Sequence, residues 1–452
     1  MDEDYSLFPS DTDLDFSFNS STTTATTTTT SSSSARTSLA RSSLTLSFNE
    51  SHFSTTTLLP HPHHTSDPHW SAIKTITNLS SDRKLHLKHL KLLSHLGTGN
   101  LGRVFLCSLK HFEHLKFALK VIDKDSLTPK KLSQVQIESH ILSLLDHPFL
   151  PTLYSHFDVS HYTCFLIDYC PNGDLHFFLR RQPHYRLPLQ SVKFFAAEIL
   201  IALEYLHALG IVYRDLKPEN VLLREDGHVM LSDFDLCFRA HVAPTFDESE
   251  FVAEPTTAFS KSCVGTHEYL APELVSGYGH GNGVDWWAFG IFIYELLYGT
   301  TPFKGRSKES TLRNIASSNK EVRFFHVGER ESEEGMEEAR DLIQRLLVKD
   351  PRRRLGCTKG ATEIKRHPFF DGIKWSLIRN YRAPLPHQQV VRKGKSPHVT
   401  PVKRQGGLWR WCKRFGCLLK NNSNSKINSS SKRNYYYNYA DSKSYSKVRK
   451  CS

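Results

Sequence analysis

The chain has 452 residues, of which 39% are hydrophobic, so it is long enough for one large two-lobed domain with tails. Its formal net charge is +12, and residues 371–452 alone hold 19 Lys or Arg against two acids. The nine cysteines include no Cys-x-x-Cys pair, and there is no run of about 18 apolar residues. These features argue against a disulfide framework, a zinc site and a membrane span, and they predict an acidic partner for the tail.

The first region, residues 1–84, is rich in Ser, Thr and His, and 13 of the 15 positions in 21–35 are Ser or Thr. Such a segment buries too little apolar surface to offset its ordering entropy, so we predict that residues 1–84 are disordered. The alternating pattern between Leu85 and Leu93 suits a first strand, and we expect ordered structure to begin there.

A glycine-rich segment follows, with the pattern Gly-x-Gly-x-x-Gly-x-Val ending at Val104. Glycines in a strand–turn–strand segment let backbone N–H groups approach a triphosphate. A plain hairpin turn is the alternative, and a dinucleotide fingerprint is disfavoured because the residues after Gly102 are strand-like. The residues of this segment predicted to bind ATP are Leu96, Gly97, Thr98, Gly99, Asn100, Leu101, Gly102, Arg103 and Val104.

Lys120 lies in the apolar run 117–122, which predicts a strand, and Glu138 lies in a predicted helix over 133–145. A charged amine in an apolar run costs free energy unless it is paired. We therefore predict that Lys120 holds the α- and β-phosphates of ATP and is itself held by Glu138. The alternative is a surface lysine whose stem covers apolar side chains.

The run Tyr-Arg-Asp-Leu-Lys-Pro-Glu-Asn at 213–220 carries the residues that phosphoryl transfer needs. Asp215 is predicted to orient a hydroxyl nucleophile and accept its proton, while Lys217 neutralises the transferring phosphate. Asn220 is a predicted metal ligand, and Asp233 of the following Asp-Phe-Asp is predicted to bind the Mg²⁺ that bridges the phosphates. At this spacing the four residues indicate a protein kinase that uses ATP and Mg²⁺.

Two segments of helical period, 191–207 and 284–297, predict a mainly helical part after the strand-rich part. The expected architecture is an α+β, two-lobed protein kinase fold over residues 90–370, with a small β-rich lobe before a larger α-helical lobe. Glu273 of Ala-Pro-Glu is expected to form a buried ion pair with Arg354, and Asp285 is expected to brace the catalytic-loop backbone.

These motifs resemble the AGC serine/threonine kinases, and Lys217 favours serine or threonine over tyrosine as the acceptor. Asp235 in place of the usual glycine, and Ser-Cys-Val-Gly-Thr-His-Glu-Tyr at 262–269, resemble the plant-specific branch. The segments Asp-Leu-Asp-Phe-Ser-Phe at 13–18 and Asp-Pro-His-Trp at 67–70 are similar to the WAG kinases, close relatives of PINOID. Residues 371–452 then correspond to a basic AGC-type C-terminal extension, which we expect to be largely disordered.

The resemblance implies a regulator of polar auxin transport that phosphorylates the cytosolic loop of PIN-type auxin efflux carriers. In similar kinases, carboxylates at the positions of Asp174, Glu219 and Glu295 receive basic residues upstream of the target. Asp174 is also expected to bind the ribose of ATP, and the two roles can coexist. We expect a monomer in the cytoplasm and at the plasma membrane periphery, with the nucleus as an alternative.

The activation segment holds a candidate phosphorylation site at Ser262. Arg214, directly before the catalytic aspartate, is a guanidinium that a phosphate on Ser262 would pair with. The alternative is an unmodified loop serine. Where relatives tend to carry a longer basic insert, this chain has acidic residues: Asp247, Glu248, Glu250 and Glu254.

The tail from Lys403 to Lys420 has the pattern of a basic amphipathic helix, which suits an anionic membrane surface. Cys412 and Cys417 are candidates for palmitoylation there. Alternatives are that this stretch packs on the kinase core, is merely solvated or binds nucleic acid, although no specific nucleic acid is expected without a zinc or helix-turn-helix pattern. For the whole chain the alternative is a catalytically weak pseudokinase scaffold, which rests on Asp235 alone.

Overall fold

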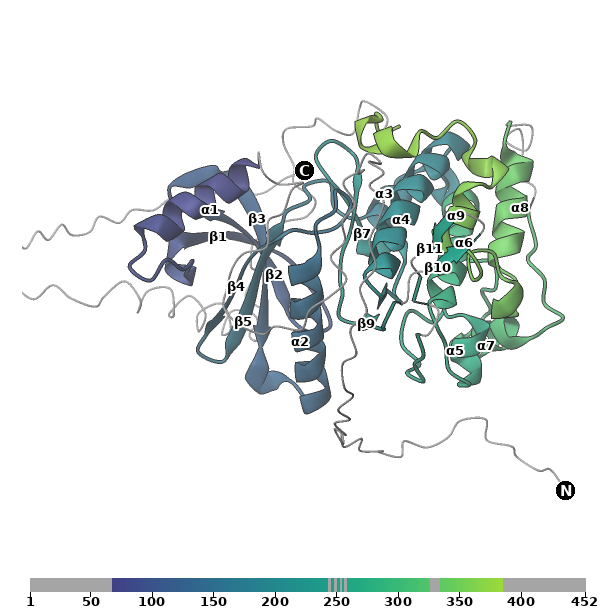
Figure 1. Cartoon of the computed structure of the whole chain (residues 1–452), viewed down its shortest axis with the longest axis horizontal. Helices are drawn as coiled ribbons and strands as arrows, with labels where there is room; N and C mark the ends of the chain where they lie inside the picture. The colour runs from purple at the N-terminus through teal and green to yellow at the C-terminus, as the bar shows by residue number, and fades with distance from the viewer. Residues whose placement is uncertain are drawn as a thin grey trace, which may run out of the picture. The chain divides into compact units, whose positions relative to one another are not determined.

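The structure is a computed structural model that describes residues 67–242, 245–247, 250–252, 254–255, 258–325 and 334–384 (Figure 1). Its strand-rich part ends at Asp168, and a mainly helical part follows. This order confirms the predicted α+β, two-lobed kinase fold. Within the described ranges, no helix is both long enough and apolar enough to cross a membrane.

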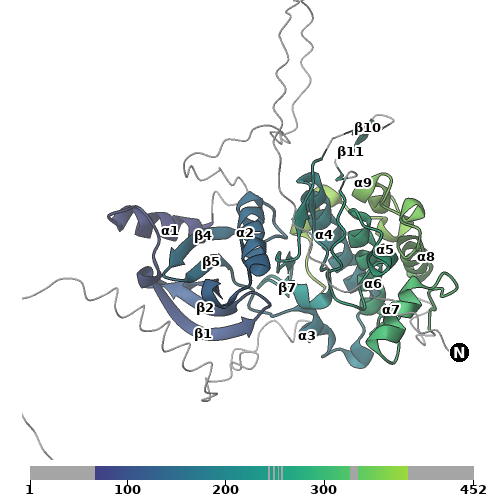
Figure 2. The ribbon, with the colours of Figure 1, turned by 90° about the horizontal axis from the view of Figure 1, so that it is seen from below.

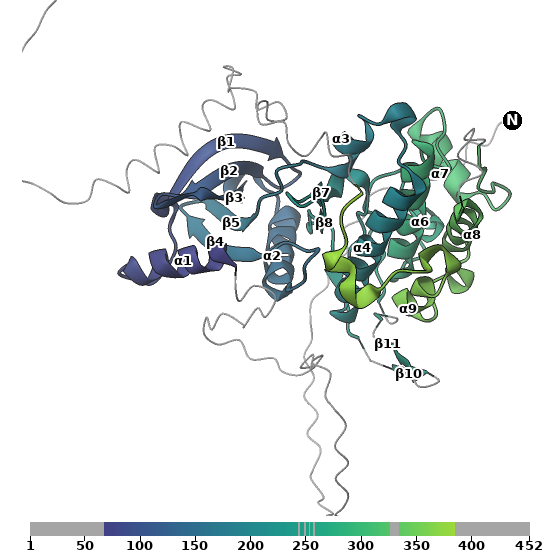
Figure 3. The same cartoon turned by 90° about the horizontal axis from the view of Figure 1, so that it is seen from above.

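The first lobe is built on one antiparallel sheet with the strand order β1-β2-β3-β5-β4 (Figures 2 and 3). Its strands are β1 (Leu90–Thr98), β2 (Arg103–Leu109), β3 (Phe112–Asp123), β4 (Leu153–Val159) and β5 (Tyr162–Asp168). The helix α2 (Pro129–Leu144) follows β3, and Thr128 caps its first turn. Because β3 pairs with β2 on one side and β5 on the other, a residue in its middle is held by two neighbouring strands.

A helix lies where the sequence predicted disorder. Helix α1 (Pro68–Leu79) begins after Asp67, whose side chain accepts the N–H of His69 at 2.8 Å, and it lies beside the sheet (Figure 3). Trp70, Ile73 and Ile76 are buried in the cluster that covers one side of the strands. The prediction of disorder over residues 1–84 was therefore wrong for this helix, and ordered structure begins before Leu85. Residues 1–66 lie outside the described part.

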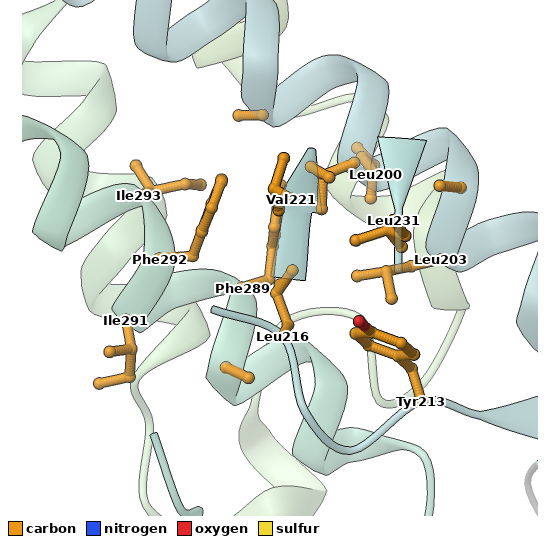
Figure 4. Packing of buried hydrophobic residues seen from close by; sticks show 14 of the residues in the cluster. Leu200, Leu203, Tyr213, Leu216, Val221, Leu231, Phe289, Ile291, Phe292 and Ile293 are labelled. Carbon is orange, nitrogen blue, oxygen red and sulfur yellow. The ribbon is translucent and has the colours of Figure 1, made fainter. Parts of the chain in front are cut away.

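The second lobe packs around α4 (Leu189–Ala208) and α6 (Gly283–Tyr298), two helices that are apolar on nearly all sides and buried. Its other elements are α3 (Leu175–Leu179), β6 (Ile211–Val212), β7 (Val221–Leu223), β8 (Val229–Leu231), β9 (Phe238–Arg239), β10 (Thr245–Asp247), β11 (Glu250–Val252), α5 (Pro272–Ser276), α7 (Lys308–Ala316), α8 (Met336–Leu346) and α9 (Gly360–Lys365). Figure 4 shows Leu200 and Leu203 of α4 beside Leu231 of β8. This apolar packing fixes the short strands that flank the catalytic loop.

The predicted helices and the strand at 117–122 are present, with ends that differ by a few residues. The strand expected at Leu85 begins at Leu90 instead, after a 3₁₀ turn over Leu87–His89. The start of the C-terminal extension is ordered, since Ile378 is buried and the Trp375 ring lies 5.4 Å from that of Phe370. Residues 385–452, including the predicted amphipathic segment, lie outside the described part.

The predicted ion pair between Glu273 and Arg354 is confirmed. Nη1 and Nη2 of Arg354 donate to the two carboxylate oxygens of Glu273 at 2.7 and 2.9 Å, and Arg354 is 1% exposed. The same guanidinium donates to the carbonyl of Gly283 at 2.8 Å, so it joins the end of the activation segment to the start of α6. Removing either partner would leave a buried charge uncompensated.

Trp70→Ala tests whether α1 is an integral part of the first lobe. Trp70 is 8% exposed, so we expect the change to lower the free energy of unfolding by about 3 kcal/mol, measured by urea denaturation. Leu79→Ala, on the same helix at a position that is 80% exposed, is the matched control and should change it by less than about 0.5 kcal/mol. Equal effects of the two variants would contradict the packing of α1 on the sheet.

Candidate active site

A buried ion pair joins the middle of the sheet to α2. Nζ of Lys120 lies 2.5 Å from Oε1 of Glu138 and 3.4 Å from Oδ1 of Asp233. Burial favours the neutral amine, but the charges of Glu138 and Asp233 outweigh it and raise the pKa of Lys120. Lys120 therefore stays cationic, as a phosphate-binding lysine requires, and the predicted Lys120–Glu138 pair is confirmed.

The catalytic loop follows β6 and is held from behind by Asp285 of α6. The Asp285 carboxylate accepts the backbone N–H groups of Tyr213 at 2.8 Å and Arg214 at 2.7 Å. Arg214 has a φ of 68°, in the left-handed region that a non-glycine residue adopts only when its surroundings compensate. Asp285 supplies that compensation, which confirms its predicted bracing role.

The Asp215 carboxylate is surrounded by donors from its own loop and from the activation segment. Oδ2 accepts Lys217 Nζ at 2.7 Å and Asn220 Nδ2 at 2.8 Å, and Oδ1 accepts the Thr266 hydroxyl at 3.2 Å. Lys217 also donates to the Thr266 hydroxyl at 3.0 Å. The structure thus brings together the three predicted residues of this loop and adds Thr266, which the sequence reading did not single out.

Oxygen donors for a divalent cation lie beside this loop. Asn220 uses its amide nitrogen in bonds to the carbonyl and the carboxylate of Asp215, which leaves the amide oxygen as its ligand atom. Asp233 offers a carboxylate and has a φ of 58°, a second strained position next to the chemistry. A carboxylate and an amide oxygen are ligands that hard divalent cations accept, so these residues fit the predicted metal role.

The glycine-rich segment comprises the end of β1, a tight turn and the start of β2, so the predicted strand–turn–strand structure is present. The N–H of Gly99 donates to the carbonyl of Gly102 at 2.9 Å. A Cβ on Gly102 would come within 2.4 Å of the Val121 carbonyl oxygen, so the turn lies against β3 and has no room for a side chain there. At Gly97 an added Cβ would meet no described atom within 4 Å, which fits a backbone that faces a ligand.

Asp235, the unusual third residue of Asp-Phe-Asp, contacts the glycine-rich turn. Its Oδ2 accepts Nδ2 of Asn100 at 3.0 Å, and Lys131 of α2 donates to the amide oxygen of Asn100 at 3.0 Å. Burial, and then the charge of Asp233, raise the pKa of Asp235. A glycine at this position would have no carboxylate to bind the turn, so Asp235 links the nucleotide turn to the metal-binding segment.

The three carboxylates predicted to recognise substrate lie in the catalytic loop or on elements next to it. Asp174 caps α3 by accepting the N–H of Phe177 at 2.7 Å, and Glu219 lies within the catalytic loop. Glu295 of α6 accepts the Tyr269 hydroxyl, and burial raises its pKa, with further contributions from the charges of Glu219 and Glu268. The sequence analysis did not single out Glu268 of the activation segment, whose charge also acts on Glu295.

The predicted partner of Ser262 contacts a different serine. Nη1 of Arg214 lies 3.3 Å from the hydroxyl of Ser260, and that hydroxyl accepts the N–H of Ser262 at 3.2 Å. Ser262 itself is exposed, and its carbonyl lies 3.2 Å from Nε2 of His280. Arg214 is therefore linked to the predicted phosphorylation site by way of the Ser260 hydroxyl, which contacts both Arg214 and Ser262.

The comparisons agree with this geometry. A protein kinase domain model matches residues 90–370. The chain is 58% identical to the serine/threonine-protein kinases WAG2 and WAG1 of Arabidopsis thaliana, covering 89% and 90% of this chain and 92% and 94% of those proteins. The chain belongs to the protein kinase family and is a serine/threonine kinase of the plant AGC group. Protein kinase PINOID 2 of Arabidopsis thaliana is 39% identical to this kinase, over 74% of this chain and 82% of its own.

The pseudokinase alternative finds no support in this site. Kinases of the group use ATP and a divalent cation, and the charged groups that phosphoryl transfer needs are all present as Lys120, Asp215 and Asp233. Asp235 does not displace any of them. It instead binds the glycine-rich turn, so its presence alters a contact and removes no catalytic group.

Proposed function

We propose that this kinase transfers the γ-phosphate of ATP to serine or threonine residues in the cytosolic loop of PIN-type auxin efflux carriers, and so regulates polar auxin transport. The proposal rests on the similarity to WAG1, WAG2 and PINOID 2 over most of the chain. The single structural observation that supports it is the group of carboxylates beside the catalytic loop, which suits target sequences with basic residues.

Each residue of the site has a place in the transfer step. Asp215 orients the acceptor hydroxyl and takes its proton, and Lys217 offsets charge on the phosphoryl group as it moves. Lys120 holds the α- and β-phosphates, and the glycine-rich turn covers them. Mg²⁺ is the cation we propose for Asp233 and Asn220, where it would neutralise the phosphate charge.

The substrate carboxylates predict a preference for arginine or lysine upstream of the target. Burial raises the pKa of Glu295, and electrostatic repulsion from Glu219 raises it further. A guanidinium between them would relieve that repulsion and form charge-assisted hydrogen bonds. Asp174 already caps α3, so its free oxygen is the candidate contact for ribose or a further basic residue.

Glu219→Gln tests substrate recognition with a peptide from a carrier loop. Losing a charge-assisted hydrogen bond of about 1.5–3 kcal/mol should raise KM for the peptide by roughly tenfold or more. The same variant should be insensitive to Arg→Ala in the peptide, because the partner is already gone. Glu337→Gln, an exposed carboxylate paired with Arg340 on α8, is the matched control. If Arg→Ala in the peptide lowers the activity of wild type and of Glu219→Gln by the same factor, Glu219 does not bind that arginine.

We propose that Ser262 is phosphorylated in the active kinase. Arg214, partly buried beside the segment, would pair with the phosphate in place of its contact to Ser260. Ser262→Ala should lower kcat, whereas Ser260→Ala should not, and mass spectrometry should find phosphate on Ser262. An unmodified Ser262 in active enzyme, with Ser262→Ala fully active, would refute the proposal.

We also propose that the basic tail holds this kinase at an anionic membrane surface, near a membrane substrate. Each Lys or Arg close to such a surface adds about 1 kcal/mol of binding free energy. A fluorescent fusion of residues 396–425 should therefore bind anionic liposomes at low salt and locate to the plasma membrane periphery. Diffuse cytosolic signal without liposome binding would exclude the anchor.

We expect the enzyme to act as a monomer.

A further inference from the structure

Glu254 belongs to the acidic insert of the activation segment, yet its side chain is buried in the second lobe. It is 5% exposed. Its Oε2 lies 2.8 Å from Nδ1 of His207 and accepts Nδ2 of Asn282 at 2.7 Å, while Oε1 accepts the N–H of Ala361 at 3.2 Å. A Cβ on Gly360 would lie 2.0 Å from Oε1 of Glu254, so the glycine at the start of α9 makes room for the carboxylate.

His207 connects this carboxylate to the catalytic loop. The ring is fully buried at the end of α4, and its Nε2 lies 2.9 Å from Oδ2 of Asp285. The same Oδ2 accepts the N–H of Tyr213, and Oδ1 accepts the N–H of Arg214. Three polar side chains, those of Glu254, His207 and Asp285, thus lead from the insert to the backbone that immediately precedes Asp215.

The charges along this path alternate in sign. The charged groups that face the His207 ring are Glu254 from the insert and Asp285 from α6, and Arg214 interacts with Asp285 from the catalytic loop. Burial favours the neutral ring, but the two carboxylates outweigh it and raise the pKa of His207 to about 10. The imidazolium therefore donates from both nitrogens at neutral pH, which orients Asp285 toward the loop.

We propose that Glu254 is a positioning residue for phosphoryl transfer: it anchors the activation-segment insert and, through His207 and Asp285, fixes the backbone that carries Asp215. The insert then has an influence on catalysis that does not require it to touch substrate. Without the Glu254 charge, His207 loses its proton at lower pH, and a neutral ring can no longer donate to both carboxylate positions.

A second buried acid–histidine pair provides a comparison on the same helix. Glu198 of α4 contacts His228 and accepts the N–H of Val229 at 2.9 Å, and both side chains are buried. This pair joins α4 to β8 and has no bond to Asp285. Its loss should cost stability in the same way as the loss of the Glu254 pair, without the effect on Asp215.

Glu254→Gln in the full-length kinase, with Glu198→Gln as the matched control, tests the proposal. We expect Glu254→Gln to lower kcat by roughly two- to thirtyfold with KM for ATP unchanged. The ratio of its kcat to that of wild type should fall further between pH 7 and pH 9, as its His207 becomes neutral. Glu198→Gln should lower the melting temperature, with a kcat ratio that stays constant over this pH range.

The proposal would be overturned if Glu254→Gln had the kcat and pH profile of wild type. It would also be overturned if the ratio of its kcat to that of wild type stayed as constant from pH 7 to pH 9 as the ratio for Glu198→Gln. If Glu254→Gln fails to fold, histidine NMR of the wild-type kinase decides the matter. At least one imidazole must then keep the chemical shifts of the protonated ring at pH 9. A wild-type protein in which all histidines are neutral by pH 8 would exclude the charged path from Glu254 to Asp285.

Discussion

The catalytic loop depends on one carboxylate, that of Asp285. It is fully buried and accepts two consecutive backbone N–H groups and a histidine nitrogen. A left-handed non-glycine residue costs on the order of 1–3 kcal/mol, and Arg214 retains that conformation because both neighbouring N–H groups are satisfied by Asp285. The position of Asp215 follows from this constraint.

The site beside the loop is organised by a balance of charges. Lys120 is the only described cation in contact with both Glu138 and Asp233, so its charge offsets carboxylates that would otherwise repel each other. Phosphate groups and a divalent cation would enter a site in which the opposing charges are already in place, which reduces reorganisation during transfer. Asp235 adds a further carboxylate, and its bond to Asn100 connects that charge to the nucleotide turn.

Much of the site was predictable because phosphoryl transfer needs specific groups at fixed separations along the chain. Lys120, Asp215 and Asp233 are identified by that spacing alone, and the structure places Lys120 in contact with Asp233. Helix α1 was missed because the surrounding Ser- and Thr-rich composition outweighed a short apolar stripe at Trp70, even though Asp-Pro is a helix start signal.

Contacts between distant segments could not be predicted from one sequence. Asn100 and Asp235 are 135 residues apart, and His207 and Glu254 are 47 apart, so no local periodicity connects them. In the sequence Glu254 is one of four acidic residues of the insert, and the packing of α4, α6 and α9 gives it buried partners. For the same reason the contact of Arg214 with the Ser260 hydroxyl was not foreseen from the sequence.

The most direct test of the account is the rate of phosphorylation of a carrier-loop fragment by Asp215→Asn beside wild type. The substitution keeps the shape of the side chain but removes the group that accepts the hydroxyl proton. We predict that kcat falls by about a hundredfold or more, with the melting temperature and ATP binding nearly unchanged. Near-normal phosphorylation by Asp215→Asn would contradict the assignment of this loop as the site of phosphoryl transfer.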